Sequence, residues 1–156
     1  MSDDNIGAGC LNSGCILDLS QFEAGPSCTR ALAWLGAEVV KIENANDGAP
    51  GRFFFGEPPD KDSWYFLLFN ASKKSIRVNL KDPAGVALVK DMARRADVMV
   101  ENFAPSAVKR LVLDYDAIRA VNAVLFKMFV FILSFLATAA CHCPRYRVFP
   151  KWKVKC

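Results

Sequence analysis

The sequence has a single histidine, and its six cysteines include no C-x-x-C pair. Cys141, His142 and Cys143 stand together, but this spacing is a poor frame for a tetrahedral metal, so we expect no metal site. The first five residues have neither a basic region nor an apolar run, so we expect no secretory signal peptide. Without a secretory context, the cysteines are expected to be reduced thiols and the protein cytoplasmic.

Acidic residues are missing from the end of the chain. All 16 Asp and Glu lie at or before Asp116, whereas the residues after Asn122 carry basic side chains and no acid. The net charge of +4 is therefore the sum of a slightly acidic body and a basic tail. A nucleic-acid-binding domain carries its basic residues on the folded body. We therefore expect no nucleic-acid partner.

The chain is long enough for one domain with a core, since it has 156 residues of which 53% are hydrophobic. Apolar runs bounded by turn residues predict strands over 15–19, 38–43, 75–80 and 97–101. Apolar spacing and proline in first turns predict helices over 26–35, 83–93, 105–111 and 114–121, with a short helix or buried turn over 64–69. The order predicts an α/β fold with a Rossmann-like open, mostly parallel sheet.

The carboxyl ends of the predicted strands are the expected binding edge, because ligands bind there in open α/β sheets. This edge would hold residues 21–25, the chain after Glu43, Lys81 and residues 101–105. The long polar loop over 44–63 adds to it, since loops of this length in compact domains are usually functional or mobile. No G-x-G-x-x-G follows the first strand, so the sequence does not indicate a dinucleotide pyrophosphate cradle.

Five stretches, in order, resemble class III CoA-transferases, the family of formyl-CoA transferase and the carnitine and benzylsuccinate CoA-transferases. They are Leu17–Pro26, Leu35–Glu43, Asn70–Ile76, Leu80–Gly85 and Ala96–Phe103. The resemblance runs to about Asn122. It implies an N-terminal α/β domain over 15–122, with an atypical segment over 1–14 before it and a non-matching tail over 123–156 after it.

The family moves coenzyme A between an acyl thioester and a free carboxylic acid. An aspartate nucleophile forms an anhydride and then an enzyme-bound thioester, which divides one difficult exchange into easier steps. The resemblance therefore implies an acyl-CoA and a small carboxylic acid as partners, with coenzyme A as a substrate and not a permanently bound cofactor. It also implies the family's homodimer of interlocked chains, although this chain is short for that.

The resemblance carries over the family's CoA-binding positions to Phe22, Glu23, Ala24, Val78, Asn79, Leu80, Lys81, Asn102, Phe103 and Arg110. Residues 22–24 resemble the segment at the thiol and acyl group, and residues 78–81 the adenine and phosphate side. Asn102 and Phe103 resemble the pair beside the pantetheine arm, and Arg110 a phosphate contact, as cations pair with phosphate oxygens. From the residues alone, the charges also fit solvated helix ends, and Phe103 fits the core.

The family's catalytic aspartate lies beyond the stretch that matches 120–122, and no acid follows Asp116 here. No catalytic residue can be assigned, and Asp18 is expected to be a structural hydrogen-bonding group. Asn44 stands where some members carry a basic CoA contact. The sequence thus predicts a truncated, inactive N-terminal fragment of a CoA-transferase. The alternative is a CoA-binding module without catalysis, either soluble or tethered to a membrane.

The segment 123–140 is apolar apart from Lys127, Ser134 and Thr138. Its length approaches that of a membrane span, and the basic residues after it would favour a cytoplasmic C-terminus. The abrupt change in composition near Asn122 favours out-of-frame or truncated sequence instead. A buried helix is the third alternative, because hydropathy does not separate it from a membrane anchor.

Overall fold

The computed structural model describes residues 9–56 and 61–129 of the chain. One five-stranded sheet is formed by β1 (Cys15–Asp18), β2 (Glu38–Asn44), β3 (Lys74–Val78), β4 (Val98–Glu101) and β5 (Phe126–Phe129). The strand order is β3-β2-β1-β4-β5, and every pairing is parallel. The expected α/β fold with an open parallel sheet is therefore confirmed.

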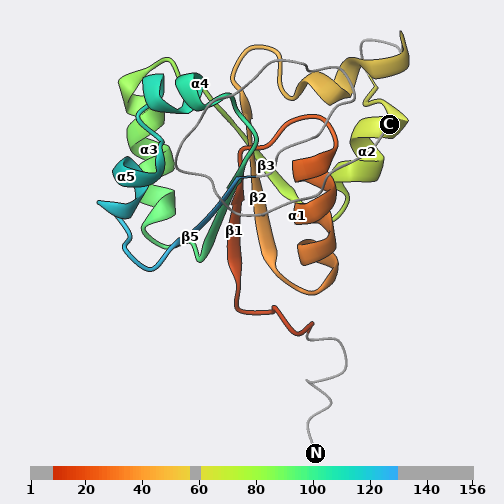
Figure 1. Ribbon diagram of the computed structural model, residues 1–156. Helices are drawn as coiled ribbons and strands as arrows, with labels where there is room; N and C mark the ends of the chain where they lie inside the picture. Colours follow the sequence, from red (N-terminus) through yellow and green to blue (C-terminus); the bar gives the residue numbers. More distant parts are fainter. Residues whose placement is uncertain (1–8, 57–60, 130–156) are drawn as a thin grey trace, which may run out of the picture.

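Helices cover both faces of the sheet (Figure 1). α1 (Ala24–Trp34) and α2 (Trp64–Asn70) lie on one face, and the other face carries α3 (Pro83–Ala93), α4 (Pro105–Arg110) and α5 (Tyr115–Arg119). The predicted helices are all present. α1 begins two residues before Pro26, so the proline stands in its first turn. The amides of the first turn have no intrahelical partner, and a residue without an N–H loses no hydrogen bond there. The loop over 44–63 contains a short 3₁₀ helix, η1 (Pro50–Gly56).

β5 was not predicted, because it lies in the apolar stretch that suggested a helix or a membrane span. It pairs with β4, and Leu125 just before it is buried in the core. Asn122 fixes its start by donating to the carbonyls of Ala93 and Ala96, at 2.9 and 3.1 Å. Residues 126–129 therefore extend the sheet. The rest of the apolar stretch lies outside the described residues, and within 9–56 and 61–129 no helix is long and apolar enough to cross a membrane.

The two faces of the sheet bury different kinds of side chain, because neighbouring residues of a strand point to opposite faces. Leu17, Ile42 and Met99 pack with α3 and α5 in an extensive apolar core. Toward α1 the apolar core is smaller and is formed by Ile16, Ala37, Val39 and Val100. At the carboxyl ends of the strands, the buried side chains on this second face are charged, as described for Asp18, Lys41 and Glu43 below.

Glu43 anchors the long connection between β2 and α2 to the sheet. Its carboxylate accepts hydrogen bonds from the Ala49 amide at 2.8 Å, from Arg52 through Nε and Nη2 at 2.7 Å each, and from the Ser75 hydroxyl. Arg52 also pairs with Asp62 and lies over the ring of Phe66. Burial raises the pKa of such a carboxyl, but these donors outweigh burial and lower the pKa of Glu43 to about 2.

We predict that Glu43→Gln lowers the free energy of unfolding at neutral pH by on the order of 3 kcal/mol, because the half-buried Arg52 loses its fully buried carboxylate partner and keeps only the exposed Asp62. The folded-state pKa lies below the ordinary value of 4.5, so the wild-type advantage is complete above that pH. It is lost as the pH falls toward 2. Denaturant unfolding of both proteins between pH 7 and pH 2.5 measures this difference.

Glu38→Gln is the matched control, since it removes a carboxylate from an exposed ion pair with Lys74 at 2.8 Å. Exposed pairs contribute less than about 1 kcal/mol, so this variant should unfold almost as the wild type does. A Glu43→Gln protein that is as stable as the Glu38→Gln protein at neutral pH would show that Glu43 is not an anchor.

Candidate functional site

The turn between β1 and α1 projects from the carboxyl edge of the sheet, and its apex is Phe22. The backbone of Phe22 has a φ of 64°, in the left-handed region that few residues other than glycine adopt. Its side chain is 44% exposed and stacks on Phe54 of η1 with the ring centroids 5.9 Å apart. Glu23 is exposed and occupies the N-cap position of α1, where its side chain makes no capping hydrogen bond. Ala24 is the first residue of α1. Such strained turns with accessible side chains concentrate at functional sites.

Asn102 joins this turn to the end of β4. The Gln21 amide donates to Asn102 Oδ1 at 2.8 Å, and Asn102 Nδ2 donates to the Gln21 carbonyl at 2.7 Å. Gly25 allows the turn to close, because a Cβ there would come within 2.1 Å of the Ser20 Cβ. The structure therefore brings residues 22–24 and Asn102 together at the carboxyl edge, as their positions after neighbouring strands predict.

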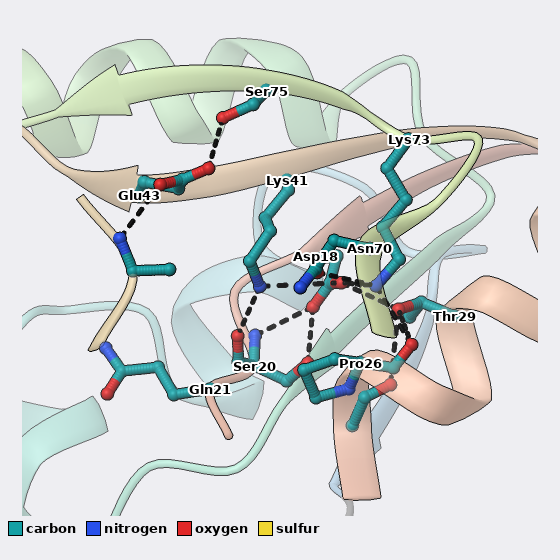
Figure 2. Close-up of polar contacts among 12 residues, drawn as sticks. Asp18, Ser20, Gln21, Pro26, Thr29, Lys41, Glu43, Asn70, Lys73 and Ser75 are labelled. Carbon is teal, nitrogen blue, oxygen red and sulfur yellow. Dashed lines mark hydrogen bonds and ion pairs between the residues drawn. The ribbon is translucent and has the colours of Figure 1, made fainter. Parts of the chain in front are cut away.

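A buried charged cluster lies behind the turn, centred on Asp18 (Figure 2). The fully buried carboxylate accepts from the Ser20 amide at 2.9 Å, the Ser20 hydroxyl, Thr29 Oγ1 at 2.6 Å and Lys73 Nζ at 2.9 Å. Lys41 Nζ lies 3.8 Å from it. Burial alone raises the pKa of Asp18, but the two lysines and the hydroxyl donors hold it below its usual value. Asp18 is thus a hydrogen-bonding group, as the sequence indicated.

The two lysines of the cluster come from different strands and reach backbone carbonyls as well. Lys41 on β2 donates to the Ser20 carbonyl at 2.8 Å, and burial lowers the pKa of Lys41 although Asp18 opposes this. Lys73, just before β3, donates to the Pro26 carbonyl at 2.9 Å and to Asn70 Oδ1 at 3.1 Å. Burial lowers the pKa of Lys73 to about 8 despite its contact with Asp18.

The predicted nucleotide-side residues, 78–81, follow β3. Val78 is buried and Leu80 packs against the same core, so these two side chains serve the fold. Asn79 and Lys81 are exposed, and Asn79 Oδ1 accepts from the Lys81 amide at 3.0 Å, which shapes the turn into α3. Because β2 lies between β3 and β1, the strands that lead into this segment and into the Phe22 turn are two strand spacings, about 10 Å, apart. The edge therefore suits an elongated ligand.

Phe103 and Arg110 lie on the β4 side of the edge. Phe103 is half-buried against the core, and its amide donates to Glu101 Oε2 at 2.9 Å. Burial raises the pKa of Glu101, although Lys127 lies 3.5 Å away and opposes the shift. Arg110 is exposed in the last turn of α4. The structure gives no contact between Arg110 and the turn.

Two features of the edge were not predicted. The first is a row of aromatic rings. Phe22 stacks on Phe54, the ring centroids of Phe54 and Tyr65 are 5.0 Å apart, and those of Tyr65 and Phe69 are 4.9 Å apart. The three consecutive phenylalanines at 53–55 were the only signal for it. The second is a polar hollow of about 480 Å³ lined by Asn46, Asp47, Arg52, Phe53, Lys61, Asp62 and Arg77.

The described residues give no support for a metal centre. Within 9–56 and 61–129, no three His, Cys, Asp or Glu side chains are grouped so that they could hold an ion. Cys10, Cys15 and Cys28 are free thiols. The residues weighed as metal ligands, Cys141 to Cys143, lie outside the described part of the chain.

Comparisons with known proteins agree with this geometry. The model of CoA-transferase family III matches residues 11–127. Formyl-CoA:oxalate CoA-transferase of Streptomyces avermitilis is 46% identical over 107 residues, which is 69% of this chain and 26% of that protein. The Escherichia coli O6:H1 enzyme of the same name is 38% identical, with the same coverage of both chains. The chain thus spans about a quarter of the length of these relatives.

Solved structures match the same part of the chain. Rv3272 from Mycobacterium tuberculosis superposes with a TM-score of 0.71 and 34% identity, covering 77% of this chain and 34% of that one. A CAIB/BAIF family protein from Brucella suis superposes with a TM-score of 0.68 and 30% identity. That match covers 74% of this chain and 31% of the other. The family match covers most of the chain, and the parallel sheet is shared with these proteins. By sequence and by fold, the chain belongs to CoA-transferase family III.

Proposed function

We propose that this domain binds coenzyme A or an acyl-CoA along the carboxyl edge of β1, β3 and β4. The observation that carries the proposal is the reciprocal pair of hydrogen bonds between Gln21 and Asn102. It holds the left-handed Phe22 turn directly beside the segment with Phe103, and so assembles two chain segments that the family resemblance assigns to one ligand. The names of the curated relatives, formyl-CoA:oxalate CoA-transferases, support the same ligand class.

Each segment has the chemistry for one part of coenzyme A. Residues 22–24 would face the thiol and acyl group, where the Phe22 ring gives an apolar wall. Asn102 and Phe103 would lie along the pantetheine arm, which has both amides and apolar carbons. The exposed Lys81, with the rest of 78–81, would meet the adenine and phosphates, and Arg110 would add a phosphate contact. Small carboxylic acids would be the acceptors of the CoA group.

Catalysis, in contrast, lacks the family's aspartate nucleophile among the described residues: the carboxylate exposed in the turn is Glu23, which the family resemblance assigns to CoA binding. A carboxylate that attacks a thioester must reach the carbonyl carbon and have a free lone pair. Asp18 is completely buried and occupied by hydrogen bonds, and no acid follows Asp116 in the sequence. We therefore propose that the 156-residue chain is a cytoplasmic, inactive part of a CoA-transferase that binds CoA without transferring it.

The second candidate function is a CoA-binding module that is not part of a transferase. It would bind CoA without catalysis, either as a soluble domain or tethered to a membrane. The absence of acids after Asp116 favours it as much as the first. A family-type homodimer and a membrane attachment through 123–140 remain predictions, and most of that segment lies outside the described residues.

We predict that the full 156-residue chain binds CoA and that Phe103→Ala weakens binding about tenfold, because the pantetheine arm loses an apolar contact. Isothermal titration calorimetry measures both affinities. Phe126→Ala is the matched control: that ring is 63% exposed but sits at the start of β5, the opposite edge of a parallel sheet. Equal CoA affinities for the Phe103 and Phe126 variants would remove Phe103 from the site, and a folded wild type that binds no CoA would contradict the proposal.

We also predict that the chain forms no covalent adduct with acyl-CoA, because the family's reacting aspartate has no counterpart in this sequence and the exposed Glu23 of the turn is assigned to CoA binding instead. The intact protein mass, recorded after incubation with formyl-CoA and oxalate, tests this directly. The Streptomyces avermitilis relative, treated in parallel, shows that the reagents are competent. A CoA-sized mass increase on this chain, or steady formation of oxalyl-CoA, would refute the absence of a nucleophile.

A further inference from the structure

We propose that Lys41 is a positioning residue that sets the Phe22 turn for the thiol end of coenzyme A; this inference rests on the proposed CoA site. Lys41 does not line the edge itself. Its side chain, only 2% exposed, extends under the turn from β2 and donates to the Ser20 carbonyl at 2.8 Å (Figure 2). Ser20 is the residue from which the turn departs.

Lys41 contributes to neutralising Asp18, but that carboxylate is not its nearest polar partner. Lys73 already pairs with that carboxylate at 2.9 Å, and Ser20 and Thr29 donate to it as well. Lys41 stands farther away, at 3.8 Å, whereas its short contact is to the Ser20 carbonyl. Burying a second ammonium group is costly unless it is fully paired. Lys41 is paired through the charge of Asp18 and through its hydrogen bond to the Ser20 carbonyl, and the second of these contacts holds the turn backbone.

The other end of the turn is held by the same cluster. Lys73 donates to the Pro26 carbonyl at 2.9 Å, and Thr29 Oγ1 lies 3.2 Å from the carbonyls of Gly25 and Pro26. The backbone is thus bound on both sides of residues 22–24. The exposed side chains of Phe22 and Glu23 lie between these two ends, so their placement depends on how the ends are held. Removing the Lys41 contact should release the first end and let the strained Phe22 backbone relax.

The nucleotide side of the proposed site is mechanically separate. Val78 and Leu80 pack in the core toward α3, on the face of the sheet opposite to Lys41. Loss of the Lys41 contact, which leaves Lys73 in place, should therefore alter contacts to the thiol end of the ligand and leave those to adenine and phosphate intact. Purely structural damage would weaken both ends together, and this difference gives the test.

The experiment compares two ligands, coenzyme A and adenosine 3′,5′-bisphosphate, by calorimetry on the full chain. For Lys41→Met, which keeps the length of the side chain and removes its donor, we expect CoA affinity to fall about tenfold, as for one lost charge-assisted hydrogen bond. The affinity for the bisphosphate should stay unchanged. Lys74→Met, from an exposed pair on β3, is the matched control and should change neither affinity.

If Lys41→Met does not fold, as judged by circular dichroism, Lys41→Gln replaces it. This variant keeps a polar side chain but is shorter and has no charge to hold the Ser20 carbonyl, so it should weaken CoA about threefold, again without effect on the bisphosphate. A parallel loss of both affinities, or no loss of either, overturns the positioning role. A wild type that binds neither ligand overturns the proposed function itself. A wild type that binds coenzyme A no more tightly than the bisphosphate overturns only the inference.

Discussion

The buried carboxylate of Asp18 is the constraint on which the carboxyl edge of this domain's sheet depends. An unpaired charge at that depth would be prohibitive, so its oxygens must be saturated with donors. The donors come from the turn, from α1 and from the chain before β3, and both lysines also bind backbone carbonyls. Satisfying one carboxylate therefore determines the relative placement of three segments. The turn geometry is a consequence of electrostatic pairing and not of apolar packing.

This explains why the two faces of the sheet are built so differently. Toward α3 and α5 the strands bury an extended apolar core, which stabilises the domain but does not direct any group. Toward α1, apolar packing stops halfway along the strands, and Glu43 with Arg52 repeats the arrangement seen around Asp18. There a buried carboxylate holds a long polar loop onto the sheet. Hydrogen bonds and ion pairs, which are directional, occur where a loop is held in a fixed position. Apolar burial, which is not directional, occurs on the face where helices only cover the sheet.

Much of this architecture could be predicted from local sequence. The strands near Leu17, Ile42 and Met99 are short apolar runs, and the turns after them follow from chain order. β5 was missed because it stands in a uniformly apolar stretch, where only its pairing with β4 distinguishes a strand from a helix. The site was partly predictable: the family resemblance pointed to Asn102, but its bonds to Gln21 span 81 positions and depend on strand order. For Lys41, the sequence predicted only a place in the strand over 38–43 and no role at the site.

The separation of binding from chemistry follows from the same electrostatics. The carboxylate buried beneath the thiol-side turn is Asp18, and everything that makes it a good anchor makes it a poor nucleophile: its lone pairs are occupied, its pKa is lowered and it has no access to solvent. To free it for attack would require breaking the contacts that shape the turn. A transferase built on this scaffold therefore needs its reacting carboxylate on another segment, facing the edge from outside. Under the proposed function, the domain described here forms the CoA-binding side of such a reaction and does not supply its nucleophile.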